Sequence, residues 1–343
     1  MRVGLLGTGA IANKHAQAYR NIGFELVACS NKTEARGRDF AQRWGAEFVS
    51  HYQDLCRYPD LDYIDVCAFP NFHLEPVREC AEIGRPVLVQ KPVATNLADA
   101  REMIRLTRDA GVPFGVVSQH RFDDSTIFLR RALGAGRLGK LLEADAYIKW
   151  FRSDEYYSRP IKGSWETEGG GALINQAIHQ VDVLQYLMGP VASVFGMWEI
   201  GARHQIESED LVNALLAYRS GAKGVIQAST AMWPGYTERI EIHGTKGSAI
   251  ISGDRLTAWN VLEDADANRL DPAPVASNVA SGASDPMAIS LTPFERQFED
   301  FAQAIRNKGQ PSVDGLEGYR ALATVLSVYQ SCREQKPVSV PTN

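Results

Sequence analysis

Short apolar runs alternate with longer amphipathic stretches along the first 120 residues. The runs predict strands at 2–6, 25–29, 63–68, 87–89 and 114–117. The stretches between them repeat their apolar positions at helical spacing and predict helices at 12–22, 34–44, 74–83 and 97–110. Strands that alternate with helices of about 10–15 residues are typical of βαβ units, so we expect an α/β domain with a doubly wound parallel sheet over residues 1–121.

The pattern changes after about residue 122. Two helices are predicted at 125–134 and 172–188, and strands at 141–150, 191–199, 211–219, 222–231, 238–244, 248–252 and 256–260. Hairpin-like links such as Ser220-Gly221 favour antiparallel pairing. We therefore expect a second, α+β domain over 122–315, with an open and mainly antiparallel sheet.

Three segments complete the organisation of the chain. The stretch 263–290 is rich in Asp, Ala, Ser and Pro and reads as a long loop. Helices are predicted at 294–306 and 316–334. We expect the last segment, 316–343, to pack back on the first domain.

Composition narrows the classes of function. The 343 residues are 45% hydrophobic and 22% charged, as in ordinary soluble proteins, and the net charge is −5. This balance argues against nucleic-acid partners and against binding to anionic membranes. We find no transmembrane or signal segment. Five cysteines without a CxxC pair suggest reduced thiols, a cytoplasmic protein and no metal site.

A glycine-rich turn follows the first predicted strand and opens the first helix. It reads Gly7-Thr8-Gly9-Ala10-Ile11-Ala12, a GxGxxA pattern in the context that dinucleotide binding requires. The first glycine permits the tight turn, the second lets a pyrophosphate approach, and the alanine permits close packing of helix on strand. The N–H groups at the helix start then face the phosphates. A plain glycine turn is the alternative.

The end of the second predicted strand reads Ser30-Asn31-Lys32, without the carboxylate that commonly binds the ribose of NAD. A 2′-phosphate would meet a hydroxyl and a cation here rather than a repelling anion. The cofactor prediction is therefore NAD(P), leaning toward NADP. Ser30 and Asn31 can also bind an unphosphorylated ribose, and Lys32 can simply be a solvated charge.

Two further segments carry residues suited to proton transfer. Lys91 follows the strand at 87–89, where a side chain at the carboxyl end of a parallel strand faces the cofactor cleft. His179 lies in a predicted helix with Asn175 and Asp182 at i,i+4 and i,i+3 spacing, which predicts one shared face. Histidine is the usual general base near neutral pH. A surface lysine and a histidine that merely bonds within a polar face are the competing interpretations.

These motifs stand in the order found in a known family. They are GTGAIA at 7–12, AFPNFH at 68–73, QKP at 90–92, a GGG-helix-His segment at 169–182, EIHGTKG at 241–247, and a C-terminal pattern from Gly309-Gln310-Pro311 to Pro337-Val338. Together they resemble the Gfo/Idh/MocA family of NAD(P)-dependent oxidoreductases over essentially the whole chain.

The resemblance implies a Rossmann domain and a second domain whose open sheet often mediates oligomers, here a homodimer or homotetramer. It also implies oxidation or reduction of sugars, cyclitols or their derivatives. The lysine of the family's E/QKP motif corresponds to Lys91 and the helix histidine to His179, and both usually flank the reacting carbinol. Family position further places Pro70, Asn71, His73 and Gln90 beside the cofactor.

The chain departs from the family at two positions. Gln90 stands where glutamate is commoner, which removes a charge beside Lys91. Asn175 stands where many inositol-type members carry aspartate, and an amide cannot accept a proton. His179 and Lys91 are then expected to handle the proton without that carboxylate. The segment around Trp150-Phe151-Arg152 and the Asn175-Gln176 pair resemble the branch that includes nucleotide-sugar 3-dehydrogenases.

Other polar and aromatic residues are candidates for the substrate site. They are His120, Arg121, Arg152, Tyr156, Trp165, Asn175 and Gln176. Arginine can bind a carboxylate or phosphate bidentately, and a tyrosine ring can stack on a sugar. For Arg121 the alternative is a salt bridge linking the domains, and for Arg152 and Tyr156 a packed loop.

The sequence thus predicts a dehydrogenase that transfers a hydride between a secondary hydroxyl of a sugar and the nicotinamide ring, the substrate lying between the domains. Two other functions stay open. One is a glycosidase that oxidises its sugar transiently on a tightly held NAD, and the other is a cofactor-sensing regulator. Net accumulation of reduced cofactor distinguishes the dehydrogenase from the glycosidase, which releases its aglycone without it.

Overall fold

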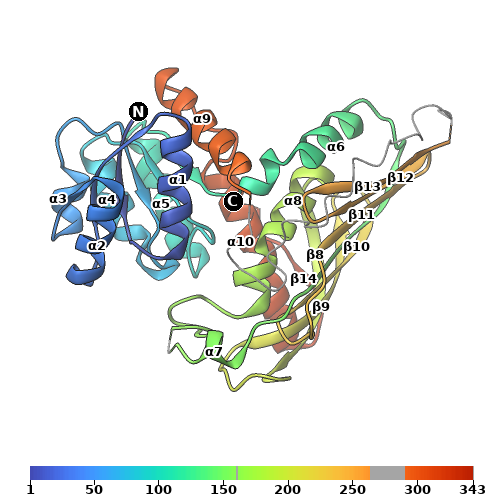
Figure 1. Ribbon diagram of the computed structural model, residues 1–343. Coiled ribbons are helices and arrows are strands. Elements are labelled where there is room, and N and C mark those ends of the chain that lie inside the picture. The colour runs from blue at the N-terminus through green and yellow to red at the C-terminus, as the bar shows by residue number, and fades with distance from the viewer. Residues whose placement is uncertain (160, 263–289, 343) are drawn as a thin grey trace. The chain divides into compact units, whose positions relative to one another are not determined.

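The computed structural model describes residues 1–159, 161–262 and 290–342 (Figure 1). The chain forms two compact units. The first comprises Met1–Gln119 and Ser290–Tyr319, and the second comprises the described residues from His120 to 262 together with Arg320–Thr342. Among the described residues, none of the helices has both the length and the apolar character of a membrane span.

The first unit contains a six-stranded sheet in the order β3-β2-β1-β4-β5-β6. The strands are β1 (Arg2–Leu6), β2 (Glu25–Ser30), β3 (Glu47–Phe48), β4 (Tyr63–Val66), β5 (Val87–Val89) and β6 (Phe114–Val116). All five pairings are parallel. Residues of β4 and β5 are buried throughout, as expected for strands covered by helices on both faces. The prediction of a doubly wound parallel sheet is confirmed.

Helices flank this sheet. They are α1 (Ala10–Asn21), α2 (Glu34–Trp44), α3 (Tyr52–Cys56), α4 (Leu74–Glu82), α5 (Leu97–Asp109) and α9 (Thr292–Arg306). Asn96 caps α5 by accepting from the Asp99 N–H at 2.9 Å. The sequence pattern did not predict β3 and α3, which are too short for a periodic signal.

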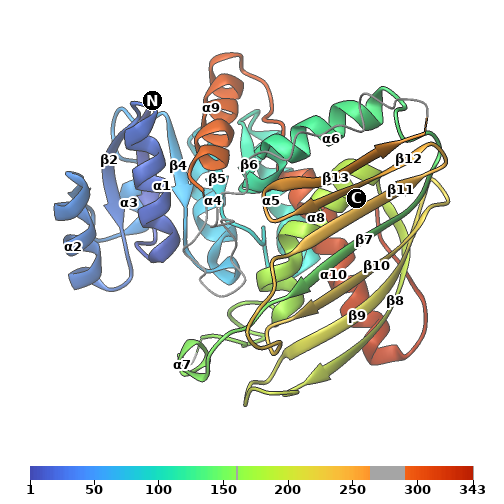
Figure 2. The same ribbon diagram turned by 45° about the vertical axis from the view of Figure 1, so that its right-hand side comes forward.

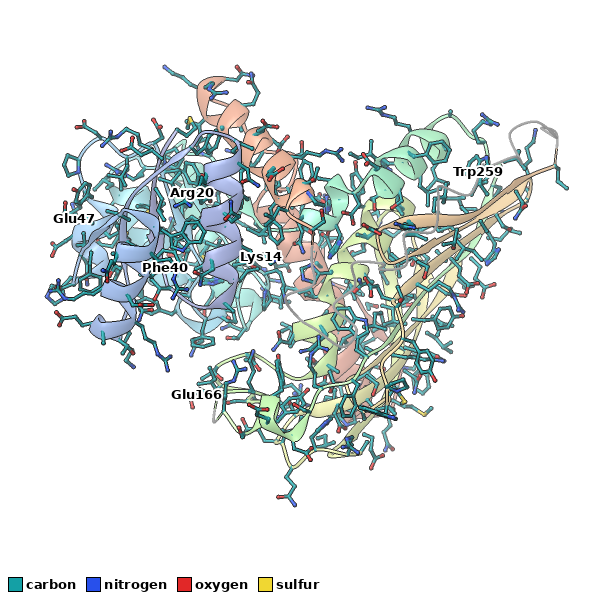
Figure 3. The ribbon with its side chains drawn as sticks, in the orientation of Figure 1. Lys14, Arg20, Phe40, Glu47, Glu166 and Trp259 are labelled. Atoms are coloured by element: carbon teal, nitrogen blue, oxygen red, sulfur yellow. The ribbon has the colours of Figure 1, made fainter. Side chains whose placement is uncertain are left out.

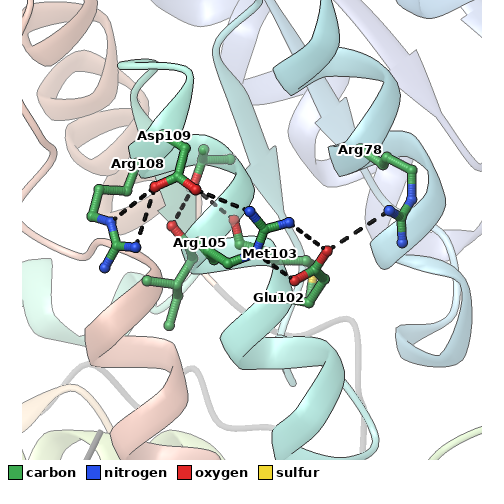
Figure 4. Close-up of polar contacts among 8 residues, drawn as sticks. Arg78, Glu102, Met103, Arg105, Arg108 and Asp109 are labelled. Atoms are coloured by element: carbon green, nitrogen blue, oxygen red, sulfur yellow. Dashed lines mark hydrogen bonds and ion pairs between the residues drawn. The ribbon is translucent and has the colours of Figure 1, made fainter.

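Charged side chains on α4 and α5 form an exposed ion-pair row (Figure 4). Arg105 contacts Glu102 at 2.8 Å and Asp109 at 2.9 Å, and Arg78 reaches Glu102 at 3.7 Å. Arg108 contacts Asp109 at 3.2 Å. Water and salt screen exposed pairs of this kind, so this row is a surface feature rather than a site.

The second unit contains an eight-stranded sheet in the order β13-β12-β11-β7-β10-β9-β8-β14. The strands are β7 (Leu141–Lys149), β8 (Val191–Ile200), β9 (Glu209–Tyr218), β10 (Lys223–Ser229), β11 (Arg239–Gly244), β12 (Gly247–Ser252), β13 (Arg255–Val261) and β14 (Val338–Ser339). Every described pairing is antiparallel apart from β7–β10. The expected open, mainly antiparallel sheet is confirmed.

Helices cover one face of this sheet (Figure 2). They are α6 (Asp124–Gly134), α8 (Ile178–Met188) and α10 (Gly315–Glu334), while the short helix α7 (Asp154–Tyr157) lies in the loop after β7. Phe128 of α6 packs edge-on against Trp259 of β13, with ring centroids 5.1 Å apart; Trp259 is labelled in Figure 3. Along β9, buried Val212, Ala214 and Leu216 alternate with more exposed residues, so the two faces of the sheet differ.

The C-terminal part of the chain is shared between the two units, whereas we expected residues 316–343 to pack on the first domain. Helix α9 belongs to the first unit, where Gln297 bonds Val116 O at 2.8 Å and accepts from Ser118 N at 3.0 Å. Residues Arg320–Thr342 belong to the second unit, and β14 adds to the edge of its sheet beside β8. A two-residue strand has no periodic signal, so its pairing was not predictable locally. The predicted loop at 263–290 lies, up to residue 289, outside the described residues.

Candidate functional site

The glycine-rich turn after β1 has the geometry that its motif predicts. Gly7 has φ +90°, and a side chain there would meet Ala68 N and Cys67 C at 2.8 Å. The Gly7 N–H donates to Ser30 O at 2.8 Å, which joins the ends of β1 and β2. Only glycine satisfies both the backbone conformation and the close approach.

The next residues leave room for a ligand at the start of α1. Gly9 is the N-cap, and apart from Gly9 itself and its two chain neighbours no described residue comes within 4 Å of the Cβ position built on it. The buried Thr8 Oγ1 has no hydrogen-bond partner among the residues that the structure describes. The helix begins with small or neutral residues, Ala10, Ile11 and Ala12. An open backbone, an unused hydroxyl and a helix N-terminus fit the pyrophosphate of a dinucleotide.

Some residues at the end of β2 already make contacts within the protein. Ser30 is buried and Lys32 is exposed. Asn31 Oδ1 accepts from the Thr8 N–H at 3.2 Å, and its Nδ2 donates to Thr33 O at 2.9 Å. Asn31 therefore supports the turn itself, and contacts of these three residues with a ribose stay a prediction.

The loop after β4 holds His73 inside the protein. Its Nδ1 lies 3.0 Å from Val93 O and its Nε2 lies 3.0 Å from Ala68 O, and burial lowers its pKa. His73 thus joins the loops that follow β4 and β5. Pro70 is buried and Asn71 is exposed in the short 3-10 helix η1 (Pro70–Phe72). We interpret His73 as a structural support of the cofactor edge, and Asn71 stays a candidate contact.

Lys91 follows β5 at the same edge of the parallel sheet as the glycine-rich turn and η1, because carboxyl ends of parallel strands share one edge. Lys91 is partly exposed. Gln90 is buried and directs its amide inward, accepting from the Lys91 N–H at 3.2 Å and lying 2.7 Å from His15 Nε2. The first unit therefore brings together the turn, Gln90 and Lys91.

In the second unit, His179 stands just after an irregular helical segment. Residues Leu173–Ala177 (η3) form a π-helix, and α8 continues from Ile178. Such π-helical turns are frequent at functional sites. A π-helical turn changes the angular spacing of side chains, and the shared face of Asn175 and His179 stays a prediction.

A second histidine packs against His179. The His120 ring lies edge-on to it, with centroids 5.1 Å apart. His120 Nδ1 lies 2.7 Å from Asp123 Oδ2. Burial alone would lower the pKa of His120, but Asp123, together with Glu238 and Asp254, raises the pKa overall. His120 and His179, which the sequence analysis named as separate site candidates, thus lie together in the second unit.

Arg121 is engaged by an acid of α8. It pairs bidentately with Asp182 at 2.6 and 2.7 Å, both side chains are buried, and its guanidinium lies over the Tyr186 ring. This pair lies within the second unit, so it does not link the domains as the alternative interpretation had it. The contact ties the short helix at Gln119–Phe122 to α8, and a substrate contact by Arg121 stays a prediction.

Glu168 is a residue that the sequence analysis missed. Its Oε1 accepts from Asn175 Nδ2 at 2.6 Å and pairs with Lys162, and its Oε2 accepts from the Gly163 N–H at 2.9 Å. Burial would lower the pKa of Lys162, but Tyr156 and Glu168 raise it overall. A carboxylate therefore does stand beside Asn175, supplied seven residues earlier in the chain.

Gln176 and Tyr156 also meet. Gln176 Nε2 donates to Tyr156 OH at 3.2 Å, and the buried Gln176 Oε1 has no partner within the described part of the chain. Arg152 is buried between Trp150 and Tyr156, with its guanidinium 5.0 and 5.7 Å from their ring centroids. The loop that carries Arg152 and Tyr156 is therefore packed. Gln176 Oε1, beside it, is a hydrogen-bond acceptor without a partner among the described residues.

Trp165 lies in an aromatic cluster with Trp198 and Tyr329, and its indole N–H donates to Glu207 O at 2.8 Å. Beside it is a cavity of about 470 Å³ lined by Tyr157, Arg159, Lys162, Gly163, Ser164, Trp165, Glu166, Gln205, Ile206 and Glu207. Glu166, on the loop after α7, is labelled in Figure 3. With its polar atom satisfied, Trp165 can offer only its ring to a ligand.

Two acids at the start of β9, which the sequence analysis also missed, hold the site in place. Glu209 accepts from Gly171 N, Leu173 N and Tyr329 OH, each at 2.8 Å, and so caps the helix that carries His179. Asp210 accepts from His204, which in turn reaches Arg152 O at 2.9 Å. Two consecutive acidic residues at the start of an otherwise apolar strand were the sequence feature that could have indicated them.

Comparisons with known proteins identify the family of both units. The family described as "Oxidoreductase family, NAD-binding Rossmann fold" matches residues 1–118, and "GFO/IDH/MocA C-terminal domain" matches 127–250. The chain is 28% identical to myo-inositol 2-dehydrogenase of Thermotoga maritima, with 99% of this chain and 98% of the relative covered. It is 28% identical to 1,5-anhydro-D-fructose reductase of Ensifer adhaerens, with 99% of each covered.

Solved structures show the same fold. The WlbA dehydrogenase from Bordetella pertussis, in complex with NADH and UDP-GlcNAcA, superposes with a TM-score of 0.86 at 28% identity, covering 100% of this chain and 99% of that one. A levoglucosan dehydrogenase in complex with NADH superposes with a TM-score of 0.87 at 19% identity, covering 100% of each chain.

Proposed function

The chain belongs to the GFO/IDH/MocA family of NAD-binding oxidoreductases, and we propose that it oxidises a secondary hydroxyl of a sugar or sugar derivative, with Lys91 and His179 handling the proton. The observation that carries this proposal is the glycine turn, tight at Gly7 and open at Gly9, with Lys91 at the same edge of the sheet. Relatives named for inositol, anhydrofructose and levoglucosan support a carbohydrate substrate.

The nicotinamide cofactor would be held by the 7–12 turn and by residues 30–32, and it supplies the hydride acceptor for oxidation. In that direction His179 accepts the proton of the hydroxyl group. The Lys91 ammonium stabilises the alkoxide that develops at the same oxygen. His120, held by Asp123, lies edge-on to His179 and orients its ring.

Substrate contacts are assigned to polar groups of the second unit. Gln176 Oε1 is buried without a hydrogen-bond partner among the described residues, and the Tyr156 hydroxyl is held beside it by Gln176 Nε2. Both suit the hydroxyl groups of a sugar, with Arg152 and Lys162 placing positive charge against the Tyr156 ring. The proposed substrate is a carbohydrate or an anionic derivative of one.

The direct test is a panel of cyclitols, sugars, sugar acids and nucleotide sugars, with absorbance of the reduced cofactor as the readout. Net accumulation of reduced cofactor with a member of the panel supports the proposal. Release of an aglycone without cofactor turnover would instead establish the glycosidase function, and no turnover with any member would refute the dehydrogenase proposal.

The cofactor preference is proposed to be weak or to favour NADP, because residues 30–32 carry no acid. Ser30→Asp is expected to shift the ratio of kcat/KM toward NAD by repelling the 2′-phosphate. The measurement is kcat/KM with both cofactors for parent and variant. A strong parental preference for NAD that Ser30→Asp leaves unchanged would contradict this interpretation.

We also propose that the second sheet pairs two copies of the chain. On the face away from the helices, Phe195, Leu215 and Val225 stand opposite one another on three neighbouring strands, and Leu215 is 58% exposed. A contiguous apolar row of this kind favours an interface. Leu215→Glu is expected to convert the homodimer or homotetramer to smaller species in sedimentation experiments.

The matched control for this interface is Leu262→Glu, because Leu262 is 80% exposed but lies beyond the end of β13. It should leave the oligomeric state unchanged. A parent chain that sediments as a monomer, or a Leu215→Glu variant that assembles like the parent, would argue against this face as the interface.

A further inference from the structure

A chain of buried side chains runs inward from Lys91 through the first unit. His15 and Tyr19 of α1, Asp65 of β4 and Gln90 after β5 are all between 0 and 6% exposed. Gln90 Nε2 lies 2.7 Å from His15 Nε2, and His15 Nδ1 lies 2.6 Å from Asp65 Oδ2. Tyr19 OH donates to the same Asp65 oxygen at 2.6 Å. This set is called the Gln90–His15–Asp65 network below.

The hydrogen bonds define which atom of each side chain is the donor and which is the acceptor. The backbone N–H of Lys91 can only donate, so the Gln90 atom facing it at 3.2 Å must be the amide oxygen. The Gln90 nitrogen then faces His15 Nε2 and donates to it. His15 Nε2 must therefore be an acceptor without a proton. The proton sits on Nδ1 and is donated to Asp65, so His15 is neutral in this network.

The same logic argues against a metal at this place. His15, Asp65 and Cys67 offer ligand atoms within 4.8 Å of one another. A metal needs a free nitrogen lone pair and a thiolate. However, the proton of His15 occupies Nδ1, and burial beside Asp65 raises the pKa of the Cys67 thiol well above its usual range. The cluster is a closed hydrogen-bond network instead.

The network joins two parts of the proposed active site. Helix α1 begins at the cofactor turn, and Gln90 bonds the backbone of Lys91. Phe294 and Phe298 of α9 pack against the His15 ring, with ring centroids 5.4 and 4.9 Å from the His15 centroid. These contacts hold the imidazole in one orientation. A rigid connection of this kind sets where the Lys91 backbone lies relative to α1.

We propose that Gln90 and His15 are positioning residues, in which the Gln90 amide locks the neutral Nδ1–H form of His15 and thereby fixes the backbone of Lys91 against the helix that starts at the cofactor turn. This inference rests on the role of Lys91 proposed above. The proposal also explains why a glutamine, rather than a glutamate, suits position 90. A glutamate at position 90 has no proton to donate, so it would require a second proton on His15.

Ring-nitrogen NMR of the histidine-labelled, full-length protein tests the protonation directly and needs no substrate. The parent is expected to show His15 with a protonated Nδ1 and an unprotonated Nε2, and Gln90→Glu is expected to show both nitrogens protonated. His15→Gln assigns the signals by their loss. A parental His15 protonated at Nε2 would overturn the proposal.

Kinetics test the positioning role with a matched pair of variants. Gln90→Leu is expected to lower kcat by about tenfold or more while the affinity for the cofactor stays within about threefold, since the lysine is misplaced but the turn is intact. Gln297→Leu is the control, because Gln297 is 2% exposed and its amide likewise makes two buried bonds, but between α9 and β6. Both variants should lose similar thermal stability.

An equal fall of kcat in Gln90→Leu and Gln297→Leu would reduce the network to ordinary structural support and overturn the positioning role. Failure of the proposed function is distinguishable, because it appears as absence of turnover in the parent with the whole substrate panel. A wrong His15 tautomer, in contrast, overturns the network while the parent remains active.

Discussion

Lys91→Ala is expected to lower kcat by roughly 10²–10⁴, the usual contribution of a positioned acid, base or charge at the reacting atoms. The affinity for the cofactor should stay within a few-fold, because the turn at Gly7 and Gly9 is built without this side chain. His179→Ala is expected to lose activity to a similar extent. In addition, the rise of kcat/KM with pH in the oxidative direction should disappear in that variant.

The measurements are steady-state kinetics on a confirmed substrate and cofactor binding by fluorescence. Lys140→Ala is the control, since Lys140 is exposed in the turn before β7 and should keep the parental kcat. Near-parental turnover in Lys91→Ala would remove this lysine from the mechanism. If His179→Ala keeps both its rate and its rising limb, another group is the base.

Glu209→Ala is expected to be the most destabilising single change in the second unit that leaves the proposed reacting groups untouched. It would leave Gly171 N–H, Leu173 N–H and Tyr329 OH buried without their acceptor. At about 1–3 kcal/mol for each buried donor, the loss near pH 5 is expected to be about 4 kcal/mol. Equilibrium unfolding in denaturant measures this loss.

The loss should depend on pH with a defined sign. Burial raises the pKa of Glu209 from 4.5 to about 7, although the bonds from Leu173, Tyr329 and Gly171 act to lower it. Between these values the folded chain holds a proton that the unfolded chain has released. The contribution of Glu209 to stability is therefore complete below pH 4.5 and declines as pH rises to about 7, by roughly 3 kcal/mol.

The difference between parent and Glu209→Ala should accordingly shrink from about pH 5 to about pH 8. Glu199→Ala is the control, because Glu199 is exposed on β8 and should change stability by no more than about 0.5 kcal/mol at any pH. A constant difference across this range would show that Glu209 does not take up its proton in the folded chain. A difference below about 1 kcal/mol throughout would show that the three donors find other acceptors.

Several elements of both units were predictable from local pattern. Apart from β3, α3 and the short 3-10 helices, the strands and helices of the first 120 residues follow from alternation of apolar runs with amphipathic segments, and the observed boundaries differ by a few residues at most. The cofactor turn was predictable because glycine tolerates φ +90° and a close approach that no other residue does. Lys91 could be placed at a functional edge because parallel strands end together there.

The supports of the candidate site, by contrast, join residues far apart in the chain. Glu209 caps a helix that starts some 36 residues earlier, judged from its bond to Leu173. Asp65 bonds His15 across 50 residues. Local periodicity cannot predict such pairs, because the two residues become neighbours only when the fold brings their elements together.

The sequence by itself therefore determined the fold class, the cofactor turn and the edge at which Lys91 stands, because each depends on backbone conformation and nearest-neighbour pattern. Only the tertiary structure decided that Asn175 is held by Glu168, that Arg121 is taken up by Asp182, and that His179 follows a π-helical turn. The physical reason is that a buried polar group must find its partner wherever the fold provides one. Its partner is a property of packing rather than of spacing along the chain.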